Sequence, residues 1–159
     1  MSSNVTILVS YGRDSLERVQ QFRYEILRKP FHLPAQSAIF AGDEFDATTH
    51  LLAYSNEEDH SNGKIVGCAS ILFSDTEKRA QLRGMAVAIE RQRRGIGKQI
   101  LDNVIALAAA REHALWCNAR LSAVGFYEHH GWVQVGEIFD IPVIGQHVVL
   151  ELRGKIKCD

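Results

Sequence analysis

A run of glycine and basic residues near the middle of the chain is suited to binding phosphate. It reads QRRGIGK, from Gln92 to Lys98, and Arg91 precedes it. The apolar residues before it predict the end of a strand, and those after it predict a helix: Ile96, Ile100, Leu101, Val104, Ile105 and Ala108. Free N–H groups and the helix dipole attract anions at a helix start, and glycine lets phosphate approach the backbone. We therefore expect a phosphate-bearing ligand.

Two common phosphate motifs do not fit this run. The Walker motif needs a glycine where this chain has Gln92, and the dinucleotide fingerprint needs glycine or alanine where it has Ile100. What remains is the pattern (Gln/Arg)-x-x-Gly-x-(Gly/Ala) between a predicted strand and a predicted helix.

A second segment, NARLSAVGFYEHHGW from Asn118 to Trp132, completes a recognisable pair of motifs. Together they resemble the GNAT superfamily of N-acetyltransferases, which carry the glycine pattern and then N-A-R-x-x-A-x-x-F-Y-x-x-x-G-F. Trp132 replaces the usual phenylalanine. The resemblance covers residues 80–135. More loosely, residues 23–30, 43–52 and 141–147 resemble small bacterial members of the ElaA-like type.

The resemblance implies an α+β fold: a mixed, mostly antiparallel twisted sheet, flanked by helices, whose central strands splay apart. The acyl-pantetheine arm of acetyl-CoA, the implied co-substrate, would lie between strands 79–87 and 114–118. Backbone groups of Met85, Ala86 and Val87 would hold the arm, and one N–H there would stabilise the oxyanion. The pyrophosphate would be held by the following run: Gln92, Arg93, Arg94, Gly95, Ile96, Gly97 and Lys98.

Two side chains of the second motif would act at the reacting centre, again by resemblance. Tyr127 would donate a proton to the departing CoA thiolate, and Asn118 would hold the arm or a water beside it. The alternatives are structural. Tyr127 could be a core aromatic residue, and Asn118 could cap the next helix.

The general base is not evident. Members of the superfamily often carry a glutamate on the central strand, where this chain offers Gln81 and Arg83. Candidates for the base, and for contact with the amine substrate, are Glu25, Asp46 and His147. The acidic group Asp43, Glu44 and Asp46 reads either as a solvated loop or as a site that recognises a cationic amine.

No metal site is predicted. His129 and His130 are adjacent, so on a helix they point in different directions, and no ligand spacing accompanies them. We expect His50, His60 and His113 to be ordinary surface or rim residues.

Composition limits the class of protein. The 159 residues, 46% hydrophobic and 23% charged, predict a single domain over residues 1–159. A net charge of −1 argues against a nucleic-acid partner. Cys68, Cys117 and Cys158 form no pairing motif, which favours a reducing cytoplasm, and no signal peptide or membrane span is evident.

The remaining patterns predict the elements around the two motifs. Strands are expected at 5–10, 50–55, 64–74, 79–87, 114–118, 132–139 and 147–153. Asp14 is expected to cap a first helix that Pro30 ends, a second helix to run to about Arg111, and a third to span 120–130. Residues 31–47 should be irregular. Gly84 should mark a bulge in its strand.

The expected function is transfer of acetyl from acetyl-CoA to a primary amine, by direct attack in a ternary complex. The acceptor would be a small molecule or a protein amine. The rival interpretation is a non-catalytic acyl-CoA sensor, whose phosphate motif would look the same. A homodimer through the last strands is also expected from the resemblance.

Overall fold

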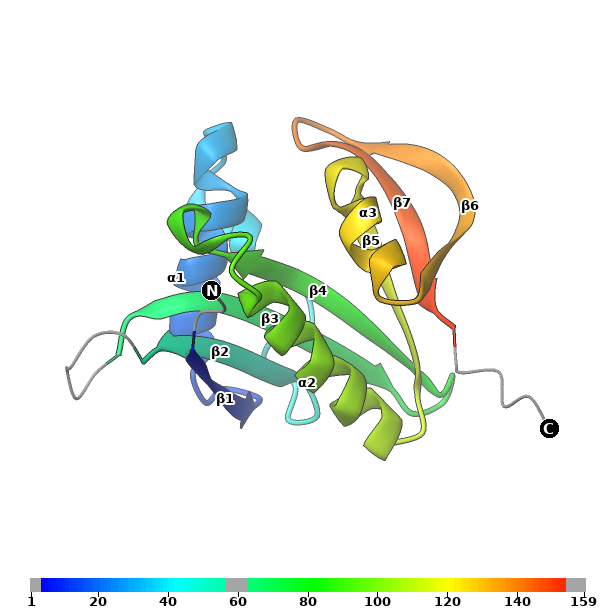
Figure 1. Ribbon diagram of the computed structural model, residues 1–159, viewed down its shortest axis with the longest axis horizontal. Helices are drawn as coiled ribbons and strands as arrows, with labels where there is room; N and C mark the ends of the chain where they lie inside the picture. Colours follow the sequence, from blue (N-terminus) through cyan, green and yellow to red (C-terminus); the bar gives the residue numbers. More distant parts are fainter. Residues whose placement is uncertain (1–3, 57–62, 154–159) are drawn as a thin grey trace.

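A single seven-stranded sheet forms the centre of the computed structural model (Figure 1). The structure describes residues 4–56 and 63–153. His60 and Cys158 lie outside the described residues. The strand order is β1-β2-β3-β4-β5-β7-β6, and only the β4–β5 pair is parallel. The strands are β1 (Val5–Tyr11), β2 (Thr49–Ser55), β3 (Ile65–Ser74), β4 (Arg79–Val87), β5 (Ala114–Arg120), β6 (Trp132–Ile141) and β7 (Gly145–Leu152). The predicted mixed, mostly antiparallel sheet is confirmed.

Helices α1 (Leu16–Leu27) and α2 (Ile96–Ala110) cover opposite faces of the sheet. Neighbouring strand residues show this, because Leu52 packs in the cluster beneath α1 while Leu51 packs in the cluster beneath α2. Helix α3 (Val124–His129) connects β5 to β6. Short 3₁₀ turns complete the chain: η1 (Lys29–Phe31), η2 (Ala35–Ala38), η3 (Ile89–Arg91) and η4 (Leu121–Ala123).

The two central strands part halfway along their length. Pairing of β4 with β5 runs from Arg79 opposite Ala114 to Leu82 opposite Cys117 and ends there. Beyond that point β5 continues beside β7, as Asn118 lies opposite Val149. Figure 1 shows β4 staying with β3 while β5 and β7 diverge from it. The predicted splay is present, and it leaves the edge of β4 that faces β5 without a strand partner beyond Leu82.

A bulge lies in β4 at the predicted position. The register between β3 and β4 shifts between Cys68 and Ser70, and Gly84 in this interval has φ +61°. A Cβ atom at Gly84 would lie 2.5 Å from Nε of Arg23. Glycine is therefore required here by both the backbone angle and the neighbouring side chain.

Two predicted helix starts are wrong. Helix α1 begins after Ser15, whose φ is +60°, because a turn closed by the Asp14 N–H on the Tyr11 carbonyl comes first. Asn118 caps no helix, because β5 continues to Arg120, which lies opposite His147 of β7. The 120–130 segment accordingly becomes a strand end, η4 and the short α3.

None of the helices within residues 4–56 and 63–153 has the length and apolar character that a membrane span requires. Strand β6 forms one edge of the sheet. A homodimer through the last strands stays a prediction.

Candidate active site

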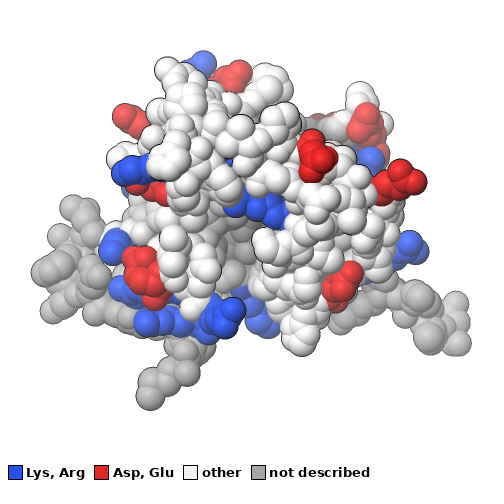
Figure 2. Space-filling model, turned by 90° about the horizontal axis from the view of Figure 1, so that it is seen from above, with Lys and Arg blue, Asp and Glu red and all other residues white. Residues whose placement is uncertain are grey.

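A cleft of about 710 Å³ lies where β4 and β5 part. Its walls come from the end of α1, the segment after η2, the middle of β4, the end of β5 and the β6–β7 hairpin. Figure 2 shows a hollow in this view, with blue Lys and Arg atoms at its centre. Five of the predicted site residues line the cleft: Met85, Gln92, Asn118, Tyr127 and His147.

Tyr127 reaches the cleft from α3 and is only 8% exposed. Its hydroxyl lies 3.8 Å from the sulfur of Met85 and beside the thiol of Cys117, while its ring packs edge-on against Trp132. Burial, together with the neighbouring Cys117, raises the pKa of Tyr127 above its ordinary value. The hydroxyl therefore stays protonated and can donate a hydrogen bond at any physiological pH.

The start of α2 presents an uncapped helix end beside the cleft. Gly95 holds the N-cap position with φ +83°, no side chain caps the helix, and the Gln99 N–H bonds to the Gly95 carbonyl. The first N–H groups of a helix, here those of Ile96, Gly97 and Lys98, have no acceptor within the helix. They are free to bind an anion, assisted by the helix dipole.

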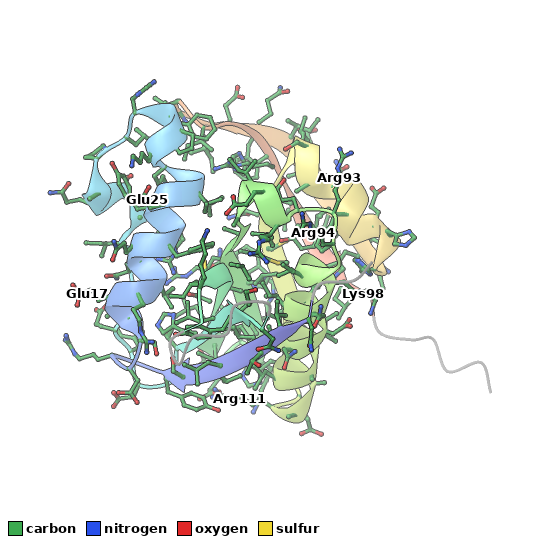
Figure 3. All side chains as sticks on the ribbon, turned by 60° about the vertical axis from the view of Figure 1, so that its left-hand side comes forward. Glu17, Glu25, Arg93, Arg94, Lys98 and Arg111 are labelled. Atoms are coloured by element: carbon green, nitrogen blue, oxygen red, sulfur yellow. The ribbon has the colours of Figure 1, made fainter. Side chains whose placement is uncertain are left out.

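Basic side chains surround this helix start. Arg93 and Arg94 are exposed, and Figure 3 shows them with Lys98 around the first turn of α2. Lys98 also pairs with Asp102 at 2.7 Å, and Gln92 donates to the Val87 carbonyl at 3.1 Å. The side chain of Ile96 is buried in the core, so only its backbone can serve a ligand.

Two of the three predicted substrate residues lie away from the cleft. Glu25 is exposed on α1, where it pairs with Lys29 at 3.0 Å, and Figure 3 shows it across the molecule from Arg93 and Arg94. Asp46 is exposed in the segment that precedes β2. It lies beside Gly12, which belongs to the turn after β1. Only His147 lines the cleft, with its Nδ1 atom 2.8 Å from the Gly145 carbonyl.

A buried ion pair supports the β4 bulge, and sequence reasoning missed it. The Asp43 carboxylate accepts from Nη1 of Arg23 at 2.7 Å, and both side chains are fully buried. Burial alone would raise the pKa of Asp43, but the Arg23 guanidinium and the Phe40 N–H hold it below its ordinary value. Asp43 is thus neither solvated nor available to recognise an amine, contrary to both expectations for the acidic group.

Two histidines expected at the surface are buried instead. His50 has no exposed area, and its ring nitrogens lie 2.8 Å from the Ser70 hydroxyl and 2.8 Å from the Asp43 carbonyl. Burial lowers the pKa of His50, which keeps it neutral beside the Arg23 guanidinium. His113 packs against Phe73 and reaches Asp75 at 3.0 Å. Both histidines are structural, and neither lines the cleft.

Cys117 also lines the cleft, at the last paired position of β5. Burial raises the pKa of its thiol to about 12, so the nucleophilic thiolate is scarce at neutral pH. Among the described residues, no three His, Cys, Asp or Glu side chains gather as metal ligands would.

The cleft therefore combines a strand edge without a partner strand, an uncapped helix start beside it and a protonated tyrosine. An extended thioester with a diphosphate at one end fits this arrangement: the arm can add to the β4 edge and the diphosphate can reach the α2 start. The residues present fit acetyl-CoA.

Comparison with known proteins assigns the family. Residues 46–134 match the family model described as an acetyltransferase (GNAT) domain. The chain is 31% identical over 142 residues to the uncharacterized N-acetyltransferase YitI of Bacillus subtilis, covering 86% of this chain and 90% of that protein.

Solved structures share the whole fold. Escherichia coli ElaA superposes with a TM-score of 0.79 at 18% identity, and an acyl-CoA N-acyltransferase from Pseudomonas aeruginosa with 0.79 at 16% identity. Each superposition covers 94% of this chain and 100% of the other. The chain belongs to the GNAT superfamily of N-acetyltransferases and is an acyltransferase enzyme.

Proposed function

We propose that this protein transfers the acetyl group of acetyl-CoA directly to a primary amine bound in the cleft between β4 and β5. The observation that carries the proposal is the loss of β4–β5 pairing after Leu82 and Cys117, which leaves a strand edge leading to the uncapped start of α2. The pantetheine arm would lie along Met85, Ala86 and Val87.

The pyrophosphate of acetyl-CoA would bind at the start of α2. Its ligands would be the N–H groups of the first helical turn and the side chains of the basic run: Gln92, Arg93, Arg94 and Lys98. Gly95 and Gly97 would let the phosphates reach the backbone.

The amine nitrogen would attack the thioester carbonyl carbon, and the carbon–sulfur bond would then break to release CoA. An N–H of the β4 edge near Met85 would stabilise the oxyanion. The amine proton would pass to His147 or to water, since the described residues that line the cleft include no carboxylate. Asn118 would hold the arm or a water beside it.

Tyr127 would stabilise the departing sulfur chiefly by a hydrogen bond. A CoA thiol has a pKa near that of cysteine, about 8.5, whereas the pKa of Tyr127 is raised above the ordinary value of about 10. Full transfer of the tyrosine proton is therefore uphill unless the cleft also raises the thiol pKa. A donated hydrogen bond needs no such transfer and still stabilises the developing thiolate.

Direct transfer is favoured over a covalent acetyl-enzyme. Cys117 is the thiol that lines the cleft, and its raised pKa makes it a poor nucleophile. The buried thiols of Cys68 and Cys117 also suit a reducing compartment, which we propose is the cytoplasm.

Mass-spectrometric detection of CoA release and of acetylated product, with acetyl-CoA and pooled amines, tests the proposal. The pools should hold polyamines, amino acids, aminoglycosides and short peptides, so that small-molecule and protein-type amines are separated. Product formed from one pool supports the proposed enzyme. Tight acetyl-CoA binding without product from any pool would favour the sensor interpretation.

A further inference from the structure

Three arginine side chains line the cleft, and among the described residues no Asp or Glu does. Arg28 follows α1, Arg83 lies on β4 and Arg120 ends β5, and all three are partly buried. Burying a guanidinium group without a counterion is costly, so such a group usually faces an anion. The cleft holds positive charge that its own lining does not neutralise.

Two of these arginines converge on one oxygen. Nη1 of Arg28 and Nη2 of Arg120 both donate to the Leu27 carbonyl, at 3.2 and 3.1 Å. Arg28 also donates from Nε to the Ser37 carbonyl, and the Arg120 guanidinium lies over the Phe31 ring. These contacts fix both groups and still leave each with N–H donors that find no acceptor among residues 4–56 and 63–153.

No carboxylate pairs with Arg28 or Arg120 within residues 4–56 and 63–153. Burial lowers the pKa of Arg28, and the charges of Arg120 and Arg23 lower it further, although a guanidinium stays charged at neutral pH. Two guanidinium groups held together without a counterion can both donate charge-assisted hydrogen bonds to one anion.

Arg83, whose guanidinium lies near the same Phe40 ring as that of Arg28, adds to this field. Nη2 of Arg83 is 3.4 Å from Oδ1 of Asp43, but that carboxylate already accepts from Arg23 at 2.7 Å. Glu44, in the exposed loop, raises the pKa of Arg83 less than Asp43 does. The group of Arg23, Arg83 and Asp43 therefore keeps a net positive charge.

The position of the pair separates it from the pyrophosphate site. Arg28 and Arg120 lie where the end of α1 approaches the end of β5. The start of α2 instead follows β4 and η3 in the chain. Arg28 and Arg120 line the cleft, whereas Arg93, Arg94 and Lys98 at the α2 start do not. The pair therefore faces the part of the cleft left for the acceptor.

We propose that the acceptor is a primary amine that also carries an anionic group, a carboxylate or a phosphate, bound by Arg28 and Arg120. This inference rests on the proposed acetyl transfer. A polycationic acceptor such as a polyamine is disfavoured, because its second ammonium would meet the arginines. The same field favours the neutral, nucleophilic form of the amine and so reduces the need for a strong base.

Matched acceptors test the charge preference. 4-Aminobutyrate against putrescine compares a carboxylate with a second ammonium at similar length, and phosphoethanolamine against ethanolamine compares the presence and absence of a phosphate. The two anionic acceptors, compared with each other, distinguish carboxylate from phosphate. Pools of carboxylate-bearing, phosphate-bearing, neutral and polycationic amines extend the comparison. The proposal predicts product mainly from an anionic pool. Product mainly from neutral or polycationic amines would overturn it while leaving acetyl transfer intact.

Arginine variants test the residues. Arg28→Gln and Arg120→Gln should each raise KM for the anionic acceptor roughly ten-fold or more, the effect of losing a hydrogen bond to a charged group, with acetyl-CoA affinity unchanged. The matched control is Arg18→Gln, because Arg18 is exposed on α1, the helix that Arg28 follows, and lies outside the cleft. An equal KM in both cleft variants and the control would overturn the assignment.

A binding measurement keeps the two proposals separate if no pool gives product. In CoA-saturated protein, whose pyrophosphate site is blocked, inorganic phosphate or 4-aminobutyrate should raise the Tm of the wild type and of Arg18→Gln but not of Arg28→Gln or Arg120→Gln. No product together with this pattern would reject acetyl transfer to amines and support the anion site. No such pattern would reject the anion site.

Discussion

Replacing Asp43 with asparagine should destabilise the fold strongly. The Asp43 carboxylate accepts from Arg23, Gln20 and the Phe40 N–H at 2.7 to 3.1 Å. All these partners are donors, so an asparagine NH₂ group would face donors and leave the buried Arg23 charge without a counterion. Removing one partner of a buried ion pair costs about 3–5 kcal/mol.

That cost is large beside a total stability of about 5–15 kcal/mol. For a chain of this length it corresponds to a fall in Tm on the order of 10 °C. Urea and thermal unfolding, followed by circular dichroism at pH 7, measure the difference. The matched control is Asp46→Asn, because Asp46 is exposed.

The effect should also depend on pH. The folded-state pKa of Asp43 is depressed, so its stabilisation is present above the unfolded pKa of about 3.9 and is lost as pH falls through the folded value. The gap between wild type and Asp43→Asn should therefore shrink below about pH 4. An Asp43→Asn protein as stable as wild type at pH 7, or a gap that does not narrow in acid, would refute the reasoning.

Three further variants or reactions test the site. Tyr127→Phe should lower kcat roughly 10²-fold with acetyl-CoA affinity unchanged, because it removes a hydrogen-bond donor to the developing thiolate, and an unchanged kcat would leave Tyr127 a packing residue. Gly97→Val should weaken acetyl-CoA binding measured by calorimetry in a folded protein, because a Cβ there already lies 3.4 Å from Phe126 and 3.7 Å from Met85, beside the entry of the arm. Equal affinity would reject the pyrophosphate assignment. Cys117, with a pKa of about 12, should resist iodoacetamide at pH 8 until the protein unfolds and should carry no acetyl group during turnover; a stable acetyl adduct found by mass spectrometry would reject direct transfer.

Local patterns along the chain predicted the elements that carry the cleft. The glycine run between apolar segments predicted the connection from strand β4 to helix α2. Gly84 predicted the bulge in β4, and the register shift confirms it. These features depend on residues close in sequence, so periodicity and turn chemistry suffice.

The features that escaped prediction depend on contacts between distant segments. Arg23 falls four residues after Val19 on the buried face of α1, yet only the fold reveals that Asp43, twenty residues on, neutralises it. Arg28 and Arg120 meet at the Leu27 carbonyl although Arg120 lies 93 positions after Leu27 in the chain. Charge partners of this kind leave no periodic signal.

Hydrogen–deuterium exchange with and without saturating acetyl-CoA tests the central claim most directly. The claim is that acyl-CoA occupies the gap where β4 and β5 part, with its pyrophosphate at the start of α2. Exchange should slow in peptides covering residues 83–99 and 116–128 and stay unchanged in β1 and the C-terminal half of α2. Protection confined to other segments, or none at saturation, would contradict the account.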